Sequence, residues 1–86
     1  MYSIVYTKKA VEDIPKIKAA GLDRKTLALI DIIRGNPYQN PPSFEKLKGD
    51  LHGAYSRRIN IQHRLVYRVD DETRTVIIIR MWTHYE

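Results

Sequence analysis

The chain has 86 residues, of which 43% are hydrophobic and 29% are charged, so it is long enough for one domain with a compact core and too short for two. Its 15 lysine and arginine residues outnumber its 10 aspartate and glutamate residues, and the resulting net charge of +5 favours a polyanionic partner, nucleic acid above all. The absence of cysteine excludes a disulfide framework and a thiolate metal site, and three scattered histidines predict no structural zinc site and no metal.

The sequence also lacks the patterns of membrane and secreted proteins. No apolar run approaches the roughly 20 residues of a membrane-spanning helix, and the N-terminus lacks a signal-peptide pattern. We therefore expect a cytoplasmic protein whose single domain spans residues 1–86.

The first 20 residues predict a short strand followed by a helix. Residues 3–6 are β-branched and aromatic, and Thr7 is suited to cap a helix over residues 8–20, where Val11, Ile14 and Ile17 form an apolar stripe. Pro15 lies inside this segment. It predicts either a kink in one helix or a second helix start capped by Asp13.

A second helix follows Gly21. Asp23 is its candidate cap, and Gly35-Asn36-Pro37 ends it. The apolar face is predicted to contain Leu27, Ile30 and Ile33, flanked by Leu29 and Ile32. We expect the two helices to form a hairpin on one face of a sheet.

The second half of the chain predicts strands. Residues 36–43 are an irregular proline-rich loop, after which Phe44 and Leu47 anchor a segment whose Glu45 and Lys48 remain open to solvent. Short alternating runs within residues 55–69 predict two adjacent strands, residues 70–74 a polar turn, and residues 75–81 an apolar strand. The predicted order is βααβββ, an α+β fold with a small, twisted, antiparallel-dominated sheet.

Two arginines are predicted to share the open face of this sheet. Alternation puts Arg58 on the face opposite Ile59, and Arg64 on the face opposite Leu65 and Tyr67. Two neighbouring guanidinium groups repel each other unless both contact an anion or a carboxylate from elsewhere in the chain. The pair therefore indicates either an anion site or a charged sheet face paired with Glu45 or Asp50.

Four segments in the second half resemble one known family. The residues are Glu45-Lys46-Leu47-Lys48, Gly53-Ala54-Tyr55-Ser56-Arg57-Arg58-Ile59, His63-Arg64-Leu65-Val66-Tyr67 and His84-Tyr85. In this order they resemble the YoeB/Txe family of bacterial toxins, within the RelE superfamily. The resemblance implies a RelE-like microbial RNase fold and a ribosome-dependent endoribonuclease, an mRNA interferase, that cuts translated mRNA.

The resemblance also implies catalytic roles. Glu45 would be the general base, Arg58 and Arg64 the pair that stabilises the phosphate, and His84 the general acid. Tyr85 would orient His84 or stack against a base. This set suits metal-free RNA cleavage, which needs a base for the ribose 2′-hydroxyl, an acid for the leaving 5′ oxygen and cations around the phosphate.

Lys48 and Arg57 are the candidate substrate-binding residues, and the resemblance implies no cofactor. His63, at the expected hairpin bend where a side chain can bond the backbone, and His52, in a loop, are interpreted as structural. Trp82 is either a core residue at the end of a strand or a stacking surface for a base.

The resemblance implies partners as well. These are the ribosome, its mRNA and a cognate, acidic antitoxin of the YefM, Axe or Phd type, part of which folds upon the toxin, and a homodimer remains open. Two other functions also remain open. One is a non-enzymatic toxin on the same scaffold, such as a ParE-like gyrase inhibitor, and the other is a basic RNA-binding module that leaves RNA intact.

Overall fold

The computed structural model describes residues 1–82 of the chain. The helices and strands follow one another as β1 (Ser3–Tyr6), α1 (Lys8–Ala19), α2 (Asp23–Gly35), β2 (Glu45–Lys46), the short 3₁₀ turn η1 (Gly49–Leu51), β3 (Tyr55–Arg58), β4 (Arg64–Asp70) and β5 (Thr75–Arg80). None of the helices within residues 1–82 is long and apolar enough to cross a membrane.

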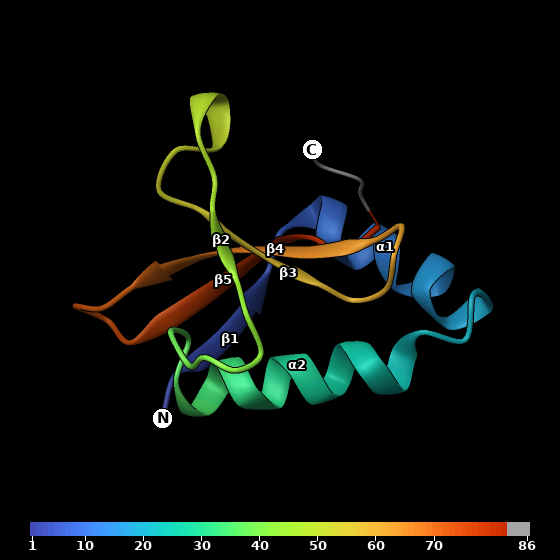
Figure 1. Cartoon of the computed structure of the whole chain (residues 1–86), viewed down its shortest axis with the longest axis horizontal. Coiled ribbons are helices and arrows are strands. Elements are labelled where there is room, and N and C mark those ends of the chain that lie inside the picture. Colours follow the sequence, from blue (N-terminus) through green and yellow to red (C-terminus); the bar gives the residue numbers. More distant parts are fainter. Residues whose placement is uncertain (83–86) are drawn as a thin grey trace.

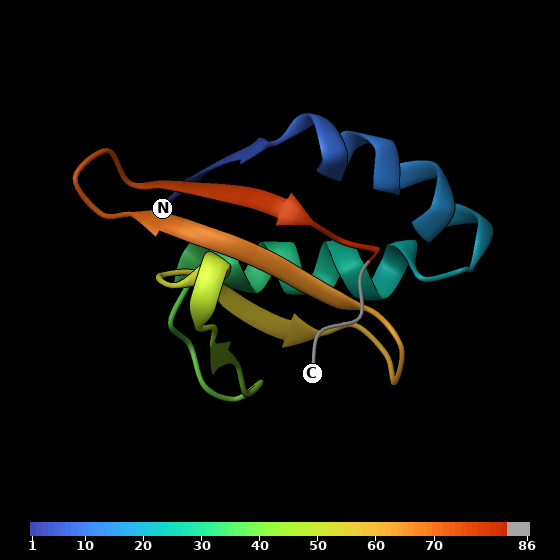
Figure 2. The ribbon, with the colours of Figure 1, turned by 90° about the horizontal axis from the view of Figure 1, so that it is seen from above.

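The strands form one sheet in the order β1-β5-β4-β3-β2, in which only β1 and β5 run parallel among the described pairs. Figure 1 shows α2 along one face of this sheet, and Figure 2 shows β1, β5, β4 and β3 side by side. The predicted α+β class and the antiparallel-dominated sheet are confirmed. The sheet has one strand more than predicted, because Glu45 and Lys46 pair with Ser56 and Tyr55.

Helix α1 begins as predicted and passes through Pro15 as one helix. The side chain of Thr7 accepts a hydrogen bond from the backbone N–H of Ala10, which confirms Thr7 as the N-cap. Asp13 caps no second helix, since it lies in the middle of this one. The predicted stripe is shifted, because Ala10, Asp13 and Ile17 are buried while Val11 remains half exposed.

Helix α2 turns Ile30 and Ile33 to the core as predicted, but Leu27 is not part of the buried face. Thr26, Leu29, Ile30 and Ile33 are buried, whereas Leu27 is 58% exposed. Buried residues at i, i+3, i+4 and i+7 form one stripe, and Leu27 lies about 100° away from Thr26 around the helix. Thr26 tolerates burial because its hydroxyl donates to the carbonyl of Leu22.

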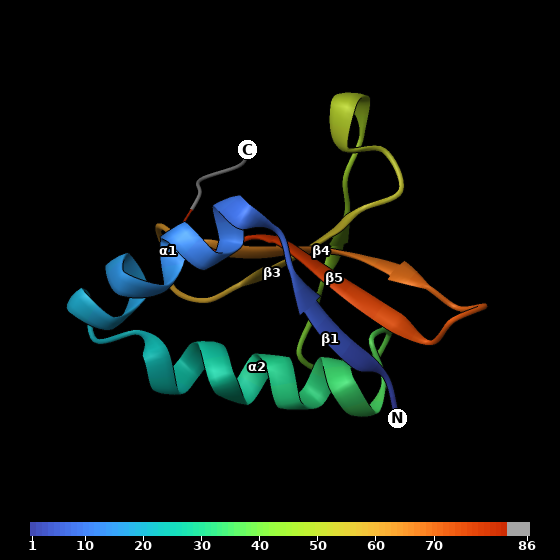
Figure 3. The ribbon, with the colours of Figure 1, turned by 180° about the vertical axis from the view of Figure 1, so that it is seen from behind.

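The start of α2 corrects a second prediction, that of its cap. The residue before the helix is Leu22, which makes no side-chain cap hydrogen bond, and Asp23 is the first helical residue. Gly21 precedes this start with a φ of 71°, a conformation that glycine adopts without strain. In Figure 3 the two helices meet at this turn, at one end of the molecule.

Different parts of the chain lie against the two faces of the sheet. Leu65, Tyr67, Val76 and Ile78 belong to the core cluster together with Leu29, Ile30 and Ile33 of α2. The other face lies on the side of residues 47–54, a segment called the arm below, which rises away from α2 in Figure 1. The open face of the sheet and the arm contain most of the predicted site residues.

Candidate functional site

The register of the strands brings one row of residues together across the open face. Glu45 of β2 lies opposite Ser56, Ser56 opposite Val66, and Val66 opposite Arg80. Directly opposed residues in antiparallel strands point to the same side, so this row crosses four strands at about 4.8 Å per step. A β-bulge between Val66 and Tyr67 in the β4–β5 pairing places Arg80 in the row.

Arg58 and Arg64 are directly opposite each other at the end of β3 and the beginning of β4. This confirms that the two arginines share the open face. Like charges opposed in this way are destabilising unless another group compensates for them. One compensating group is Glu45, whose Oε1 is 3.6 Å from Nη1 of Arg64.

The pair formed by Glu45 and Arg64 is accessible from solvent. The side chain of Glu45 is 68% exposed and that of Arg64 is 18% exposed, and Arg58 is exposed as well. An ion pair this open to water contributes at most about 1 kcal/mol, so a bound anion can replace the carboxylate at little cost. The arrangement therefore combines a base with two cations that are available to a phosphate.

A cleft adjoins these residues. It has a volume of about 420 Å³ and is lined by Glu45, Lys46, Leu47, Lys48, Asp50, Leu51, Ser56 and Arg64. A second hollow of about 230 Å³ is lined by Ser43, Phe44, Glu45, Ser56, Arg58 and Arg64. Glu45, Ser56 and Arg64 border both hollows. Lys48 lines the larger one and Arg58 the smaller one, so four predicted site residues, Glu45, Lys48, Arg58 and Arg64, surround these two adjoining hollows.

Arg57 corrects the sequence prediction. It was expected to bind substrate, but it is 1% exposed and lies on the core face, opposite Leu65. Its Nη1 donates to the carbonyl of Pro42 at 2.6 Å, and its Nη2 donates to the carbonyls of Pro37 and Gln39 at 3.1 and 2.9 Å. A guanidinium occupied in this way has no free edge for a phosphate.

These bonds give Arg57 a structural role next to the site. Its Nε donates to the hydroxyl of Tyr67 at 3.0 Å, and its guanidinium lies 4.8 Å from the ring centre of Phe44. The hydroxyl of Tyr67 in turn donates to the carbonyl of Pro37 at 2.7 Å. Arg57 therefore holds the irregular loop of residues 37–44, which ends immediately before Glu45.

The phenol of Tyr67 is neutral in this arrangement. Burial raises the pKa of Tyr67 above its ordinary value, and the hydrogen bond from Arg57 opposes that rise only in part. Phe44 and Tyr55 meet edge to face at 5.6 Å between ring centres, and Tyr55 also contacts Tyr67. The loop is thus anchored on rings as well as on hydrogen bonds, which confirms Phe44 as an anchor.

The predicted residues His84 and Tyr85 lie outside the described residues, the last of which is Trp82. Trp82 stacks on His63 with ring centres 3.7 Å apart, directly before Arg64 in β4. Trp82 also packs against the core cluster, as one of its two predicted roles requires. The backbone bond expected of His63 is not seen in residues 1–82: its buried Nδ1 has no hydrogen-bond partner there, and the side chain that accepts backbone N–H groups at this turn is that of Asn60.

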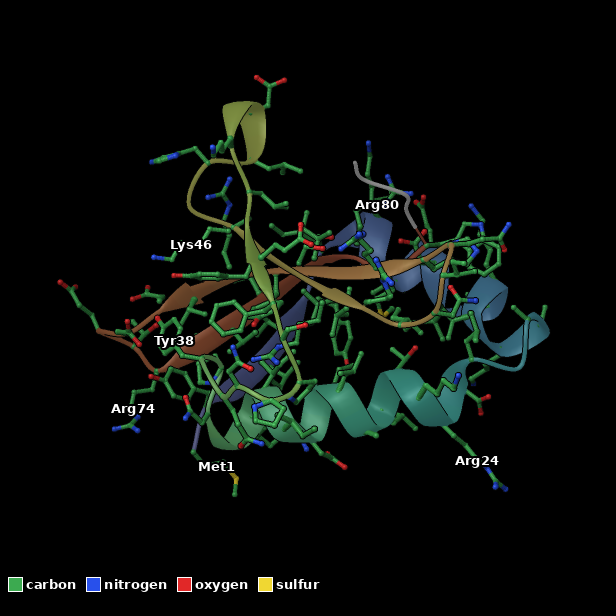
Figure 4. The ribbon with its side chains drawn as sticks, viewed as in Figure 1. Met1, Arg24, Tyr38, Lys46, Arg74 and Arg80 are labelled. Atoms are coloured by element: carbon green, nitrogen blue, oxygen red, sulfur yellow. The ribbon has the colours of Figure 1, made fainter. Side chains whose placement is uncertain are left out.

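Asp13 is a functional candidate that the sequence analysis missed. It is 1% exposed, and its Oδ2 accepts hydrogen bonds from Nε of Arg80 at 3.0 Å and from the backbone N–H groups of Met81 and Trp82 at 2.9 and 3.1 Å. Burial raises the pKa of Asp13, but these hydrogen bonds outweigh it and leave the pKa below its ordinary value. Figure 4 shows Arg80 on the side of the sheet opposite α2.

The sequence analysis considered Asp13 only as a possible helix cap, and no motif predicted its buried bonds to Arg80, Met81 and Trp82. Within residues 1–82, no three histidine, aspartate or glutamate side chains gather closely enough to hold a metal ion.

Comparison with known proteins identifies the family. Residues 6–85 match the sequence profile described as YoeB-like toxin of bacterial type II toxin-antitoxin system. The chain belongs to the YoeB-like toxin family. Toxin YoeB of Mycobacterium bovis is 39% identical over 89 residues, which cover 99% of this chain and 100% of that protein.

Solved structures of the same family share the fold. A YoeB/ParE toxin from Agrobacterium tumefaciens superposes with a TM-score of 0.86 at 32% identity, covering 96% of this chain and 99% of the other. The YoeB-YefM complex from Staphylococcus aureus gives a TM-score of 0.81 at 35% identity over 99% of both chains, and the YoeB dimer from the same organism gives 0.80 at 35% identity over 98% of both. This chain is thus a YoeB-like toxin of a type II toxin–antitoxin system.

Proposed function

We propose that this YoeB-like toxin is a ribosome-dependent mRNA endoribonuclease that uses the ribose 2′-hydroxyl as its nucleophile. The observation that supports it best is the meeting of Glu45 with Arg58 and Arg64 on one open face, beside a cleft. A carboxylate within 3.6 Å of one guanidinium, with a second guanidinium directly across the strand pair, provides a base and a phosphate clamp in one place.

In this mechanism each group has one task. Glu45 takes the proton of the 2′-hydroxyl while the 2′ oxygen attacks the phosphorus. Arg58 and Arg64 bind the phosphate oxygens and stabilise the charge that develops in the transition state. The bond from phosphorus to the 5′ oxygen breaks, and His84 gives its proton to that oxygen. The products are a 2′,3′-cyclic phosphate and a free 5′-hydroxyl.

Lys48 and Tyr85 would have supporting roles in this reaction. Lys48, in the wall of the larger hollow, would hold a neighbouring phosphate as a mobile point charge. Tyr85 would orient His84 or stack against a base.

The assignment of His84 draws support from the end of the described chain. Trp82 stacks on His63, one residue before Arg64. His84 follows Trp82 by two residues, a span of at most about 7 Å. The described chain that leads toward the predicted general acid thus lies, at Trp82, beside the residue that precedes Arg64.

Dependence on the ribosome follows from the openness of the site. Glu45 and Arg58 are exposed, so the toxin by itself neither encloses an RNA strand nor excludes water from it. A small surface of this kind needs a partner that holds the RNA in the geometry for in-line attack. The ribosome, which presents mRNA in the cytoplasm, would supply that positioning.

We further propose that the chain pairs with a YefM-like antitoxin and forms a homodimer. The relatives from Staphylococcus aureus were solved as a YoeB-YefM complex and as a YoeB dimer. The net charge of +5 favours an acidic antitoxin segment that folds over the basic site. Co-expression of an acidic partner encoded next to the toxin should abolish toxicity and yield a stable complex.

The test is primer extension on a translated message after induction of the toxin. We expect defined breaks in the parent and none in Glu45→Ala, Arg64→Ala or His84→Ala. Arg24→Ala is a suitable control, because Arg24 projects from α2 on the other side of the sheet in Figure 4. Growth arrest with DNA damage and intact mRNA would refute the proposal in favour of a gyrase-directed toxin.

A further inference from the structure

The hydroxyl of Ser56 is buried in the middle of the candidate site. Ser56 is 1% exposed, and it borders both hollows together with Glu45 and Arg64. Within the part of the chain that the structure describes, its Oγ has no hydrogen-bond partner. A buried polar group without a partner costs free energy, so this hydroxyl does not support the fold of the free toxin.

Packing alone does not explain a serine at this position. Ser56 lies between Glu45 of β2 and Val66 of β4 in the row that crosses the open face. A small side chain here leaves room for Glu45 to approach Arg64 across β3, at 3.6 Å between Oε1 and Nη1. Alanine would leave the same room and would bury no unpaired hydroxyl. The oxygen atom of Ser56 is therefore the feature that calls for a function.

Glu45 is the neighbour that this hydroxyl can reach. The two residues are directly opposite each other in the pairing of β2 with β3, which puts their Cβ atoms about 4.5–5.5 Å apart on the same face. The carboxylate of Glu45 lies at the end of a flexible side chain that is 68% exposed. A change of rotamer brings one of its oxygens within hydrogen-bond distance of Ser56. In the free toxin the carboxylate lies toward Arg64 instead.

Substrate binding removes the partner that Glu45 has in the free toxin. In the proposed function Arg64 binds a phosphate oxygen, and its solvent-accessible ion pair with Glu45 is displaced at little cost. The released carboxylate has several rotamers, of which few place an oxygen against the ribose 2′-hydroxyl. A hydrogen-bond donor fixed on the neighbouring strand would restrict Glu45 to one of them.

We infer that Ser56 is a positioning residue for the general base: when a phosphate occupies Arg64, Glu45 exchanges its contact with Arg64 for a hydrogen bond from the hydroxyl of Ser56. The inference rests on the proposed function, in which Glu45 takes the proton of the 2′-hydroxyl. Ser56 donates to one carboxylate oxygen, and the other oxygen remains for the ribose. The bond forms only with substrate present, which explains the unpaired hydroxyl of the free toxin.

Two substitutions of similar size isolate the hydroxyl. Threonine and valine are both branched at Cβ, and threonine has a hydroxyl where valine has a methyl group. Ser56→Thr and Ser56→Val therefore add similar bulk to β3, and only Ser56→Thr keeps the donor. Ser56→Ala removes the donor and adds no bulk.

The first measurement is thermal unfolding of the isolated toxin. Ser56→Ala should melt no more than about 3 °C below the parent, or above it, because the substitution breaks no hydrogen bond in the free state. A larger fall in melting temperature would overturn the inference, since the hydroxyl would then have a structural partner.

The second measurement is single-turnover cleavage of mRNA on programmed ribosomes. Ser56→Ala and Ser56→Val should lower the maximal rate about tenfold and leave the half-saturating ribosome concentration within about twofold of the parent. Ser56→Thr should cleave within about threefold of the parent. In a Glu45→Ala background, where no base remains to be positioned, Ser56→Ala should cost less than about twofold. Ser3→Ala is a control, because Ser3 is an exposed serine of β1, at the other edge of the sheet.

The outcomes separate this inference from the proposed function. If Glu45→Ala cleaves like the parent, Glu45 is not the base, and the proposed function and the inference fail together. If Glu45→Ala is slow but Ser56→Thr and Ser56→Val cleave at the same rate, only the inference fails. It also fails alone if Ser56→Ala costs as much in the Glu45→Ala background as in the parent, because Ser56 would then act through another group.

Discussion

The neighbouring residues Arg57 and Arg58 should respond in opposite ways to the same substitution. Arg57 is buried and donates to the carbonyls of Pro37, Gln39 and Pro42 and to the hydroxyl of Tyr67. Arg58 is exposed and lines the smaller hollow next to Glu45 and Arg64. Arg57→Ala should therefore destabilise the fold, whereas Arg58→Ala should leave the fold intact and abolish cleavage.

The expected loss in free energy of unfolding for Arg57→Ala follows from the contacts of Arg57. Hydrogen bonds that involve a charged group contribute about 1.5–3 kcal/mol each, and they are not additive within one network. Breaking a buried charged network by removing one partner typically costs about 3–5 kcal/mol. Since small domains are stable by about 5–15 kcal/mol, Arg57→Ala should lose a large fraction of its free energy of unfolding. Exposed Arg58→Ala should change it by less than about 0.5 kcal/mol.

Urea denaturation followed by Trp82 fluorescence measures both free energies, and primer extension measures cleavage. Arg57→Lys is an informative third variant, because lysine keeps the charge but offers one nitrogen where the guanidinium offers three to separate acceptors. The free energy of unfolding of Arg57→Lys should fall between those of the parent and Arg57→Ala. The reasoning would be refuted by an Arg57→Ala protein within about 1 kcal/mol of the parent, or by an Arg58→Ala protein destabilised to the same extent.

Three further predictions concern the carboxylate of Glu45, the buried carboxylate of Asp13 and the buried face of α2. Glu45→Gln should retain the melting temperature of the parent and lose about 10²–10⁴-fold in single-turnover cleavage, because an amide takes no proton. The lowered pKa of Asp13 means that its contribution to stability is present above about pH 4 and is lost as the pH falls through the folded-state value, so urea titrations between pH 6 and pH 3 should show a shallower acid loss in Asp13→Asn than in the parent. Leu27→Ala should change the free energy of unfolding by less than about 1 kcal/mol and Leu29→Ala by about 2–5 kcal/mol, since only Leu29 is buried, and equal losses would contradict the observed helix face.

The sequence by itself determined the features that depend on neighbouring residues. The strand Ser3–Tyr6, the cap at Thr7 and the turn between Asp70 and Thr75 follow from local conformational preferences. The shared face of Arg58 and Arg64 follows from alternation along each strand, because side chains on successive residues must point to opposite sides. Family resemblance added the remaining site residues, including His84 and Tyr85.

Only the tertiary structure decided which polar residues are buried and what they bind. Arg57 and Arg58 are identical in type and adjacent, yet Arg57 holds the loop before Glu45 and Arg58 lines the smaller hollow. Asp13 sits among lysines in the sequence, and its partners lie 67 or more residues away. Local patterns describe the conformation of a segment, whereas burial and pairing depend on which distant segment packs against it, and that is fixed only when the whole chain folds.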